Sequence, residues 1–170
     1  KSINKMWTII KADLKNLEFL KNEFRKKIGN DVKIYSPKLL IQKYKKNKLI
    51  GKELYLLGDY LFCHHAKFKK NETINLLKFT RGLKYFLSGF TQSQKDIEKF
   101  INKCKEAENK KGYLTQSFYE LYKNNNYKFA SGPFAEKIFK IINLQKNKID
   151  ILLGNIKTTI NKKEFSFIPL

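Results

Sequence analysis

The strongest constraint on this fold is a short strand whose two faces are both apolar. The run Tyr60-Leu61-Phe62-Cys63 follows a Gly-Asp turn signal and is rich in residues that favour β-strands. Side chains alternate along a strand, so we expect Tyr60 and Phe62 on one face and Leu61 and Cys63 on the other. One face covers a hydrophobic core. The second face must be covered by something else, and there we expect function.

The residues ahead of that run predict a strand, a helix and a further strand. Met6–Lys11 has the apolar and β-branched residues of a strand. Asp13 then offers an N-cap, apolar residues recur at helical spacing, and Gly29 ends the pattern as a C-cap residue does. Residues 32–35 predict the further strand.

A lysine-rich turn predicts a hairpin in the next stretch. Residues 38–44 and 50–57 are both strand-like, and Lys45-Lys-Asn-Lys48 separates them. The basic tip either contacts phosphates or is an ordinary soluble loop.

The sequence after the central strand continues with a mixed α and β pattern. Residues 71–82 predict a second helix or turn region, and residues 83–87 predict the last strand of this domain. Another helix is predicted from Thr91, with Ser93 as its N-cap and one apolar stripe that reaches Cys104.

We therefore expect an α+β protein of two domains, the first comprising residues 1–104, with an antiparallel sheet and flanking helices. Residues 105–123 are predicted as a linker because their first part is polar and lacks a strand pattern, although residues 114–122 are apolar enough to pack on a domain. Residues 124–170 carry two periodicities. Their short apolar runs fit a small five-stranded β-barrel, which we favour, and they also match a helical stripe.

The formal net charge of +21 points to polyanions as partners. A field of this sign and size attracts nucleic acid and speeds encounter with it. The same excess of lysine has a second explanation in the coding bias of an AT-rich genome. Charge by itself fixes no site.

No catalytic, metal-binding or membrane-spanning pattern is found. The sequence lacks a Gly-rich phosphate loop, a His-Glu-x-x-His motif and a Cys-x-x-Cys pair. Cys63, His64 and His65 with the distant Cys104 would be zinc ligands, but adjacent strand residues point to opposite faces and do not close on one ion. The two histidines are instead expected near the surface, at the end of the strand. No apolar run approaches the roughly 20 residues of a membrane span, and no signal-peptide core is seen. With two isolated cysteines indicating a reducing compartment, we expect a cytoplasmic monomer without catalytic residues, cofactor or metal.

Five short motifs stand in a particular order along the chain. They are Trp7-Thr-Ile-Ile10, Ile34-Tyr-Ser-Pro37, Leu56-Leu-Gly-Asp-Tyr-Leu-Phe62, Thr80-Arg-Gly-Leu-Lys-Tyr-Phe-Leu87 and Ser131-Gly-Pro-Phe-Ala135. Their sequences and order resemble those of the NusG family of transcription elongation factors, closest to its specialised RfaH branch. Two positions depart from the family: Gly58 replaces a proline, and a glycine expected after the last motif is missing.

This resemblance implies a fold and a function. Residues 1–104 would be the family's NGN domain and residues 124–170 its SH3-like KOW barrel; in the RfaH branch the second domain also folds as a helical hairpin. The implied activity is transcription elongation and antitermination. Such a factor binds RNA polymerase at the clamp helices, favours the closed, processive state and reduces pausing or termination.

The resemblance also implies binding residues. Tyr60 and Phe62, with Trp7, fall in the clamp-binding patch, for which ordinary core packing is the structural alternative. Arg81 matches an arginine that faces the non-template DNA strand, and we place Lys78 beside it; capping or ion pairing is the alternative for Arg81. Residues 73–75 stand where the family contacts the polymerase gate loop. The second domain would meet a ribosomal protein, termination factor Rho or neither.

One alternative function keeps the nucleic acid but removes the polymerase. A basic chain with a KOW domain would also suit a protein that binds ribosomal RNA or another nucleic acid. An enzyme acting on nucleic acid comes third, because clusters of acidic residues are missing.

Overall fold

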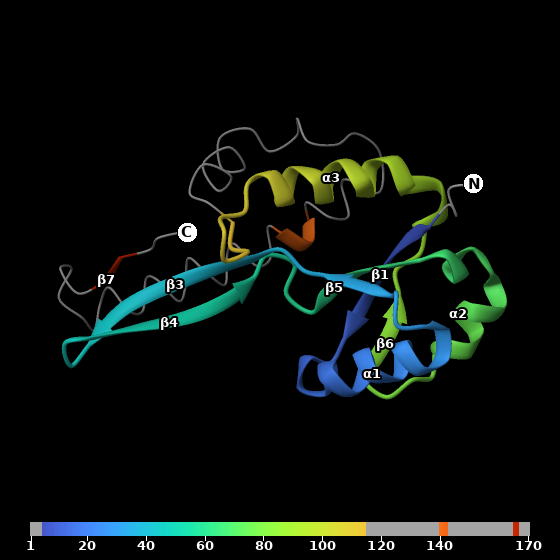
Figure 1. Cartoon of the computed structure of the whole chain (residues 1–170), viewed down its shortest axis with the longest axis horizontal. Coiled ribbons are helices and arrows are strands. Elements are labelled where there is room, and N and C mark those ends of the chain that lie inside the picture. The colour runs from blue at the N-terminus through green and yellow to red at the C-terminus, as the bar shows by residue number, and fades with distance from the viewer. Residues whose placement is uncertain (1–4, 115–139, 143–164, 167–170) are drawn as a thin grey trace. The chain divides into compact units, whose positions relative to one another are not determined.

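The protein has an α+β fold, seen here in a computed structural model that describes residues 5–114, 140–142 and 165–166 (Figure 1). The chain divides into two compact units. One comprises Lys1–Ser36 with Asp59–Glu98, and the other comprises Pro37–Gly58 with Lys99–Leu170. A segment of the second unit is therefore inserted between two parts of the first.

The first unit is built on a four-stranded antiparallel sheet. Its strand order is β2-β5-β1-β6. The bounds are β1 (Met6–Ala12), β2 (Lys33–Tyr35), β5 (Tyr60–His65) and β6 (Leu83–Phe86). These four strands confirm the predicted ones to within about two residues, and the two most apolar, β1 and β5, are central.

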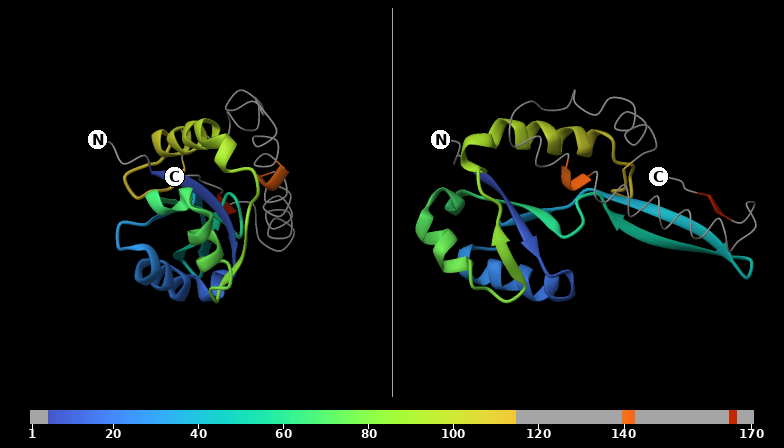
Figure 2. Two further views of the ribbon diagram at one scale, coloured as in Figure 1. Left: turned by 90° about the vertical axis from the view of Figure 1, so that its right-hand side faces the viewer. Right: turned by 180° about the vertical axis from the view of Figure 1, so that it is seen from behind.

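Two helices cover one face of this sheet, α1 (Leu17–Ile28) and α2 (Asn71–Leu77) (Figure 1). Asp13 acts as predicted, but on a short 3-10 turn, η1 (Leu14–Asn16), where its side chain accepts the Lys15 N–H at 3.1 Å. A second 3-10 turn, η2 (Ala66–Lys69), precedes α2. Figure 2 shows both helices from two further directions.

The core of this unit lies between these helices and the sheet. Leu61 and Cys63 point into it, as the alternation along β5 predicted. The other buried members are Ile10, Ala12, Leu20, Phe24, Ile28, Val32, Phe68, Leu77 and Leu83.

The expectation that His65 lies near the surface is wrong. β5 continues through His65, whose ring is only 4% exposed. Its Nε2 lies 2.8 Å from Asp31 Oδ1, and its Nδ1 accepts the Lys67 backbone N–H at 3.1 Å. Because Nδ1 acts as an acceptor, the proton sits on Nε2, and the ring joins the end of β5 to the loop before β2.

The second unit contains the predicted hairpin with its basic tip. β3 (Lys38–Lys45) pairs with β4 (Lys48–Tyr55), and the two turn residues, Lys46 and Asn47, have φ angles of 50° and 60°. Positive φ at both positions is the geometry of a type I′ turn, which matches the twist of the strands. A short strand, β7 (Phe165–Ser166), pairs with the other edge of β3.

Helix α3 (Gln94–Glu106) follows a 3-10 turn, η3 (Thr91–Ser93), and crosses the boundary between the two units. The helix predicted from Thr91 is thus confirmed, and it extends two residues past Cys104. The expected linker thus begins inside α3, and its residues 109–113 form a tight turn: Asn109 Oδ1 accepts the N–H groups of Lys111 and Tyr113.

The end of that turn is held by the base of the hairpin. Leu114 is buried, and its N–H donates to the Lys38 carbonyl at 2.9 Å. The Tyr113 hydroxyl donates to Glu53, which also pairs with Lys38 at 3.4 Å. The rest of the expected linker lies outside the described residues. So does most of the expected barrel, of which only the helical residues 140–142 and β7 are described.

Candidate binding surfaces

The sheet of the first unit has a second face, turned away from α1 and α2, that is rich in aromatic side chains. The register of β1 against β5 sets Ile9 opposite Phe62 and Lys11 opposite Tyr60. Alternation then places all four on the face that the helices do not cover. We call this surface the aromatic face; it comprises Trp7, Ile9, Lys11, Tyr35, Tyr60, Phe62, His64 and Tyr85.

The structure brings the three predicted patch residues onto this one face, but it buries two of them. Trp7 is 7% exposed and Phe62 fully buried, whereas Tyr60 is half-buried. The Trp7 ring stacks on His64 at 4.4 Å between centroids and meets Phe62 edge-on at 6.2 Å. Tyr35 stacks on the other side of Phe62 at 6.3 Å. The centre of the aromatic face is thus packed as a core is.

Gln94, the first residue of α3, is hydrogen-bonded to the backbone of Trp7. Its Oε1 accepts the Trp7 N–H at 2.8 Å, and its Nε2 donates to the Trp7 carbonyl at 2.8 Å and to the Phe90 carbonyl at 2.7 Å. The amide satisfies both backbone groups of Trp7 as a residue of a neighbouring strand would. It thereby fixes the start of α3 to β1.

The accessible part of the aromatic face is a pair of tyrosines. The hydroxyls of Tyr60 and Tyr85 lie 2.8 Å apart, and the ammonium of Lys11 lies 5.4 Å and 6.0 Å from their ring centroids. Burial, followed by the hydrogen bond to Tyr85 and the nearby charge of Asp59, raises the pKa of Tyr60 to about 12. Tyr85 is 44% exposed.

Sequence reasoning missed Tyr85 and Lys11 as members of this face. The pairing of β1 with β6 shifts between Lys11 and Ala12, so that both Leu83 and Phe86 pack on the helix side although they are three residues apart. Such a bulge breaks the alternation by which Tyr85 would have been assigned. The available signal was an aromatic residue, Tyr85, within the predicted strand 83–87.

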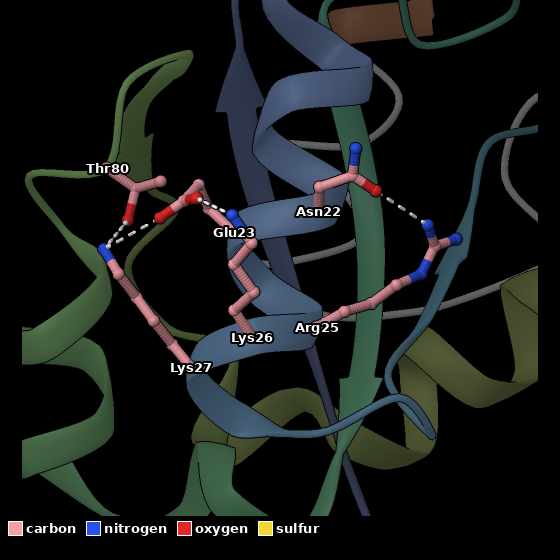
Figure 3. A network of polar contacts seen from close by, with 6 residues as sticks. All are labelled: Asn22, Glu23, Arg25, Lys26, Lys27 and Thr80. Carbon is pink, nitrogen blue, oxygen red and sulfur yellow. Dashed lines mark hydrogen bonds and ion pairs between the residues drawn. The ribbon is translucent and has the colours of Figure 1, made fainter.

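A second candidate surface, the basic turn, comprises Lys78–Gly82 between α2 and β6. The Asp13 N–H donates to the Gly82 carbonyl at 2.8 Å, and Lys27 of α1 donates to Thr80 Oγ1 at 3.2 Å (Figure 3). Gly82 has a φ of 91°, and a Cβ there would stand 3.0 Å from Asn16 Cβ. The turn is therefore held close against the start of α1.

Both predicted nucleic-acid residues lie exposed on the basic turn. The guanidinium of Arg81 lies 5.5 Å from the centroid of the Phe19 ring, and the Lys78 ammonium lies 5.0 Å from that of Phe79. Within the described ranges, neither cation makes an ion pair or a side-chain hydrogen bond. The capping or pairing alternative for Arg81 has no partner among those residues.

Acidic charge near the basic turn is matched by lysines of α1. Figure 3 shows Glu23 between Lys26 and Lys27, with N–O distances of 3.2 Å and 4.0 Å, and Arg25 bonded to Asn22 at 3.2 Å. Glu23 is therefore paired within its own helix and with neither Lys78 nor Arg81.

No protein-family model matches this chain, and no curated protein does either. The features that bear on function are therefore the two surfaces and the motifs that lie in them.

The residues expected at the gate loop, 73–75, lie on α2, where Thr73 is buried and Asn75 exposed.

The described residues contain no cluster of metal ligands: no three side chains of His, Cys, Asp or Glu come together in this part of the chain. Cys63 and His65 point to the helix side of the sheet, while His64 stacks on Trp7 on the other side, and burial raises the pKa of the Cys63 thiol to about 12. No helix among these residues has the length and apolarity to cross a membrane.

Proposed function

We propose that the protein is a transcription elongation and antitermination factor of the NusG type, specialised as in the RfaH branch, that binds RNA polymerase through its aromatic face. The observation that carries this proposal is the register of β1 and β5. It sets Trp7, Tyr60 and Phe62, which come from two separate motifs of the resemblance, on one face of one sheet.

The proposed action involves no chemical step. A factor that binds the closed clamp of the polymerase more tightly than the open clamp shifts the enzyme toward the closed state by that difference in affinity. Pausing, which needs the open state, then becomes rarer. Large aromatic side chains at the centre of an interface supply much of the affinity such a factor needs.

In this structure the accessible entrance to the aromatic face is the pair Tyr60 and Tyr85. Trp7 and Phe62 are buried, so a clamp helix reaches them only after the face has been uncovered. Lys11, which lies over both tyrosine rings, would then face a carboxylate or a helix C-terminus of the partner.

The basic turn supplies the second part of the proposal. Arg81 and Lys78 would contact the non-template DNA strand where the polymerase exposes it. Residues 1–104 are proposed as the NGN domain and residues 124–170 as the KOW domain, which would contact a ribosomal protein or Rho.

Binding to purified core RNA polymerase, treated with nuclease, tests this function. Double replacement Tyr60→Ala and Tyr85→Ala should weaken binding by at least about 30-fold, since truncating even one aromatic anchor costs about 2 kcal/mol. Phe79→Ala, which removes an equally aromatic but far more exposed ring on the basic turn, is the matched control and should bind as the wild type does.

Two outcomes would contradict the proposal. Wild-type protein that binds polymerase only before nuclease treatment would be a nucleic-acid binding protein without polymerase contact, the alternative function. A double variant that binds polymerase normally, with a native circular dichroism spectrum, would exclude the aromatic face as the docking surface.

A further inference from the structure

Two exposed phenylalanine rings, Phe79 in the basic turn and Phe19 of α1 beside Arg81, are used by no part of the proposed function. Resting on that function, we propose that Phe79 and Phe19 stack on unpaired bases, so that the ligand of the basic turn is single-stranded nucleic acid held with little regard to base identity. Arg81 and Lys78 would hold the phosphates on either side of the stacked bases.

Both rings are open to solvent: Phe79 is 86% exposed and Phe19 is 45% exposed. Isolated apolar side chains are common on protein surfaces, but these two rings are connected by one turn, since Arg81, two residues after Phe79, lies 5.5 Å from the centroid of the Phe19 ring. Aromatic faces open to solvent are what an unpaired base needs for stacking.

Each ring has its own cation. Lys78 lies 5.0 Å from the centroid of Phe79, and Arg81 lies 5.5 Å from that of Phe19. A nucleotide presents a flat base next to an anionic phosphate, so a ring beside a cation matches both of its parts. A protein partner would cover the rings but would leave two desolvated charges to be matched separately.

The backbone of the basic turn is held in place by hydrogen bonds. The Thr80 N–H donates to the Leu77 carbonyl at 2.9 Å, and the Leu83 N–H donates to the Thr80 carbonyl at 3.0 Å. Gly82 allows the chain to pass close to Asn16, and Lys27 ties Thr80 to α1. Since these bonds already fix the backbone that carries Phe79, less conformational entropy is lost when a strand binds.

The chemistry of the ligand follows from these features. In a duplex the base faces are stacked on one another and are not offered to a ring, whereas a single strand offers every base face. Stacking on a ring is tolerant of base identity, because every base has a flat face. The turn should therefore prefer single strand over duplex and tolerate different bases.

Fluorescence anisotropy of the full chain with labelled oligonucleotides tests the inference. The probes are an unpaired thymine oligomer, an unpaired adenine oligomer and a blunt duplex of the same length. Phe79→Ala should bind both single strands about tenfold more weakly, the effect of losing one stacked base, and should bind the duplex as before. Phe79→Trp should retain the affinity, and its new indole fluorescence should be quenched by the single strands only.

Leu76→Ala is the matched control, because it removes an exposed apolar side chain that has no cation partner. It should bind all three probes like the wild type. Phe79 is so exposed that its truncation should leave the circular dichroism spectrum native.

The inference is overturned if Phe79→Ala and Phe19→Ala bind the single strands normally, or if they lose duplex binding to the same extent. It is also overturned if Phe79→Ala binds the oligonucleotides normally but loses nuclease-treated polymerase, because the ring would then contact protein. Failure of the proposed function gives a separate result: wild-type protein would prefer single strands through Phe79 yet would not bind polymerase.

Discussion

Tyr60 and Phe62 lie two residues apart on one face of β5, yet they differ in what a substitution can reveal. Phe62 is fully buried and packed between Trp7 and Tyr35, so Phe62→Ala removes core contacts and should cost about 3–5 kcal/mol of stability. Any loss of polymerase binding in that variant would be a loss of fold. Tyr60 is half-buried, and its hydroxyl is hydrogen-bonded to that of Tyr85. A substitution of Tyr60 therefore tests binding by the accessible part of the aromatic face.

Gly82 is the residue on which the position of the basic turn depends. Gly82→Ala should destabilise the protein by about 1–3 kcal/mol, because φ is 91° and the new Cβ would stand 3.0 Å from Asn16 Cβ and 3.1 Å from the Asn16 carbonyl oxygen. Urea unfolding followed by circular dichroism measures the loss. Gly112→Ala is the control: its φ is 80°, but no atom lies within 4 Å, so it carries the backbone strain without the clash. Equal losses in the two variants would show that contact with Asn16 is unimportant.

At the scale of elements, the hairpin is joined to the end of the turn that follows α3 by three side chains. Tyr113 donates to Glu53, Lys38 pairs with the same carboxylate, and the Lys38 ammonium lies 5.1 Å from the centroid of the Tyr113 ring. The hydrogen bond from Tyr113 is the main reason that the pKa of Glu53 is lowered from its ordinary 4.5. This bond therefore favours the folded state at a pH above about 4.5, and that contribution is lost as the pH falls through the lowered pKa.

Tyr113→Phe should loosen this attachment. We expect the pKa of Glu53 to rise toward its ordinary value, as measured by nuclear magnetic resonance titration of its side chain. The amide of Leu114, which donates to the Lys38 carbonyl, should exchange with solvent faster above about pH 5.5, roughly one unit over the ordinary pKa of 4.5. Tyr55→Phe, which changes a tyrosine at the base of the same hairpin, should leave both quantities unchanged. An unaltered Leu114 exchange rate in Tyr113→Phe would show that the backbone bonds alone hold the turn.

At the scale of the whole molecule, the local sequence pattern was enough to predict the strands and helices. It was not enough to predict which faces of these elements are buried. Alternation in Tyr60–Cys63 correctly assigned the core side of β5, and Asp13 and Gly29 marked the ends of the helical region. Periodicity reports which residues share a face; it does not report whether a face is open, and so it left core packing and an exposed patch as alternatives for Trp7 and Phe62, which the structure shows to be buried.

Other features of the molecule arise from contacts between distant parts of the sequence. The register shift between Lys11 and Ala12 made the face of Tyr85 unpredictable from alternation. The buried ring of His65 is hydrogen-bonded to Asp31, which is 34 residues away in the sequence. The grouping of residues 37–58 with the second unit is likewise a property of tertiary contacts, which sequence order alone does not contain.

From the net charge of +21 we predict how nucleic-acid binding by the whole chain depends on salt concentration. Binding to bare duplex should fall steeply with salt, because each phosphate contact contributes about −0.9 to the slope of log K against log salt. Arg81→Ala should reduce that slope by no more than about one, since most contacts come from lysines elsewhere. Single-strand binding adds stacking, which releases no counterions, so its affinity extrapolated to about 1 M salt should exceed that for duplex. Phe79→Ala should reduce this excess by about tenfold, the effect of losing one stacked base, and leave the slope unchanged. If the two lines of the wild type meet at high salt, charge alone accounts for all of the nucleic-acid binding.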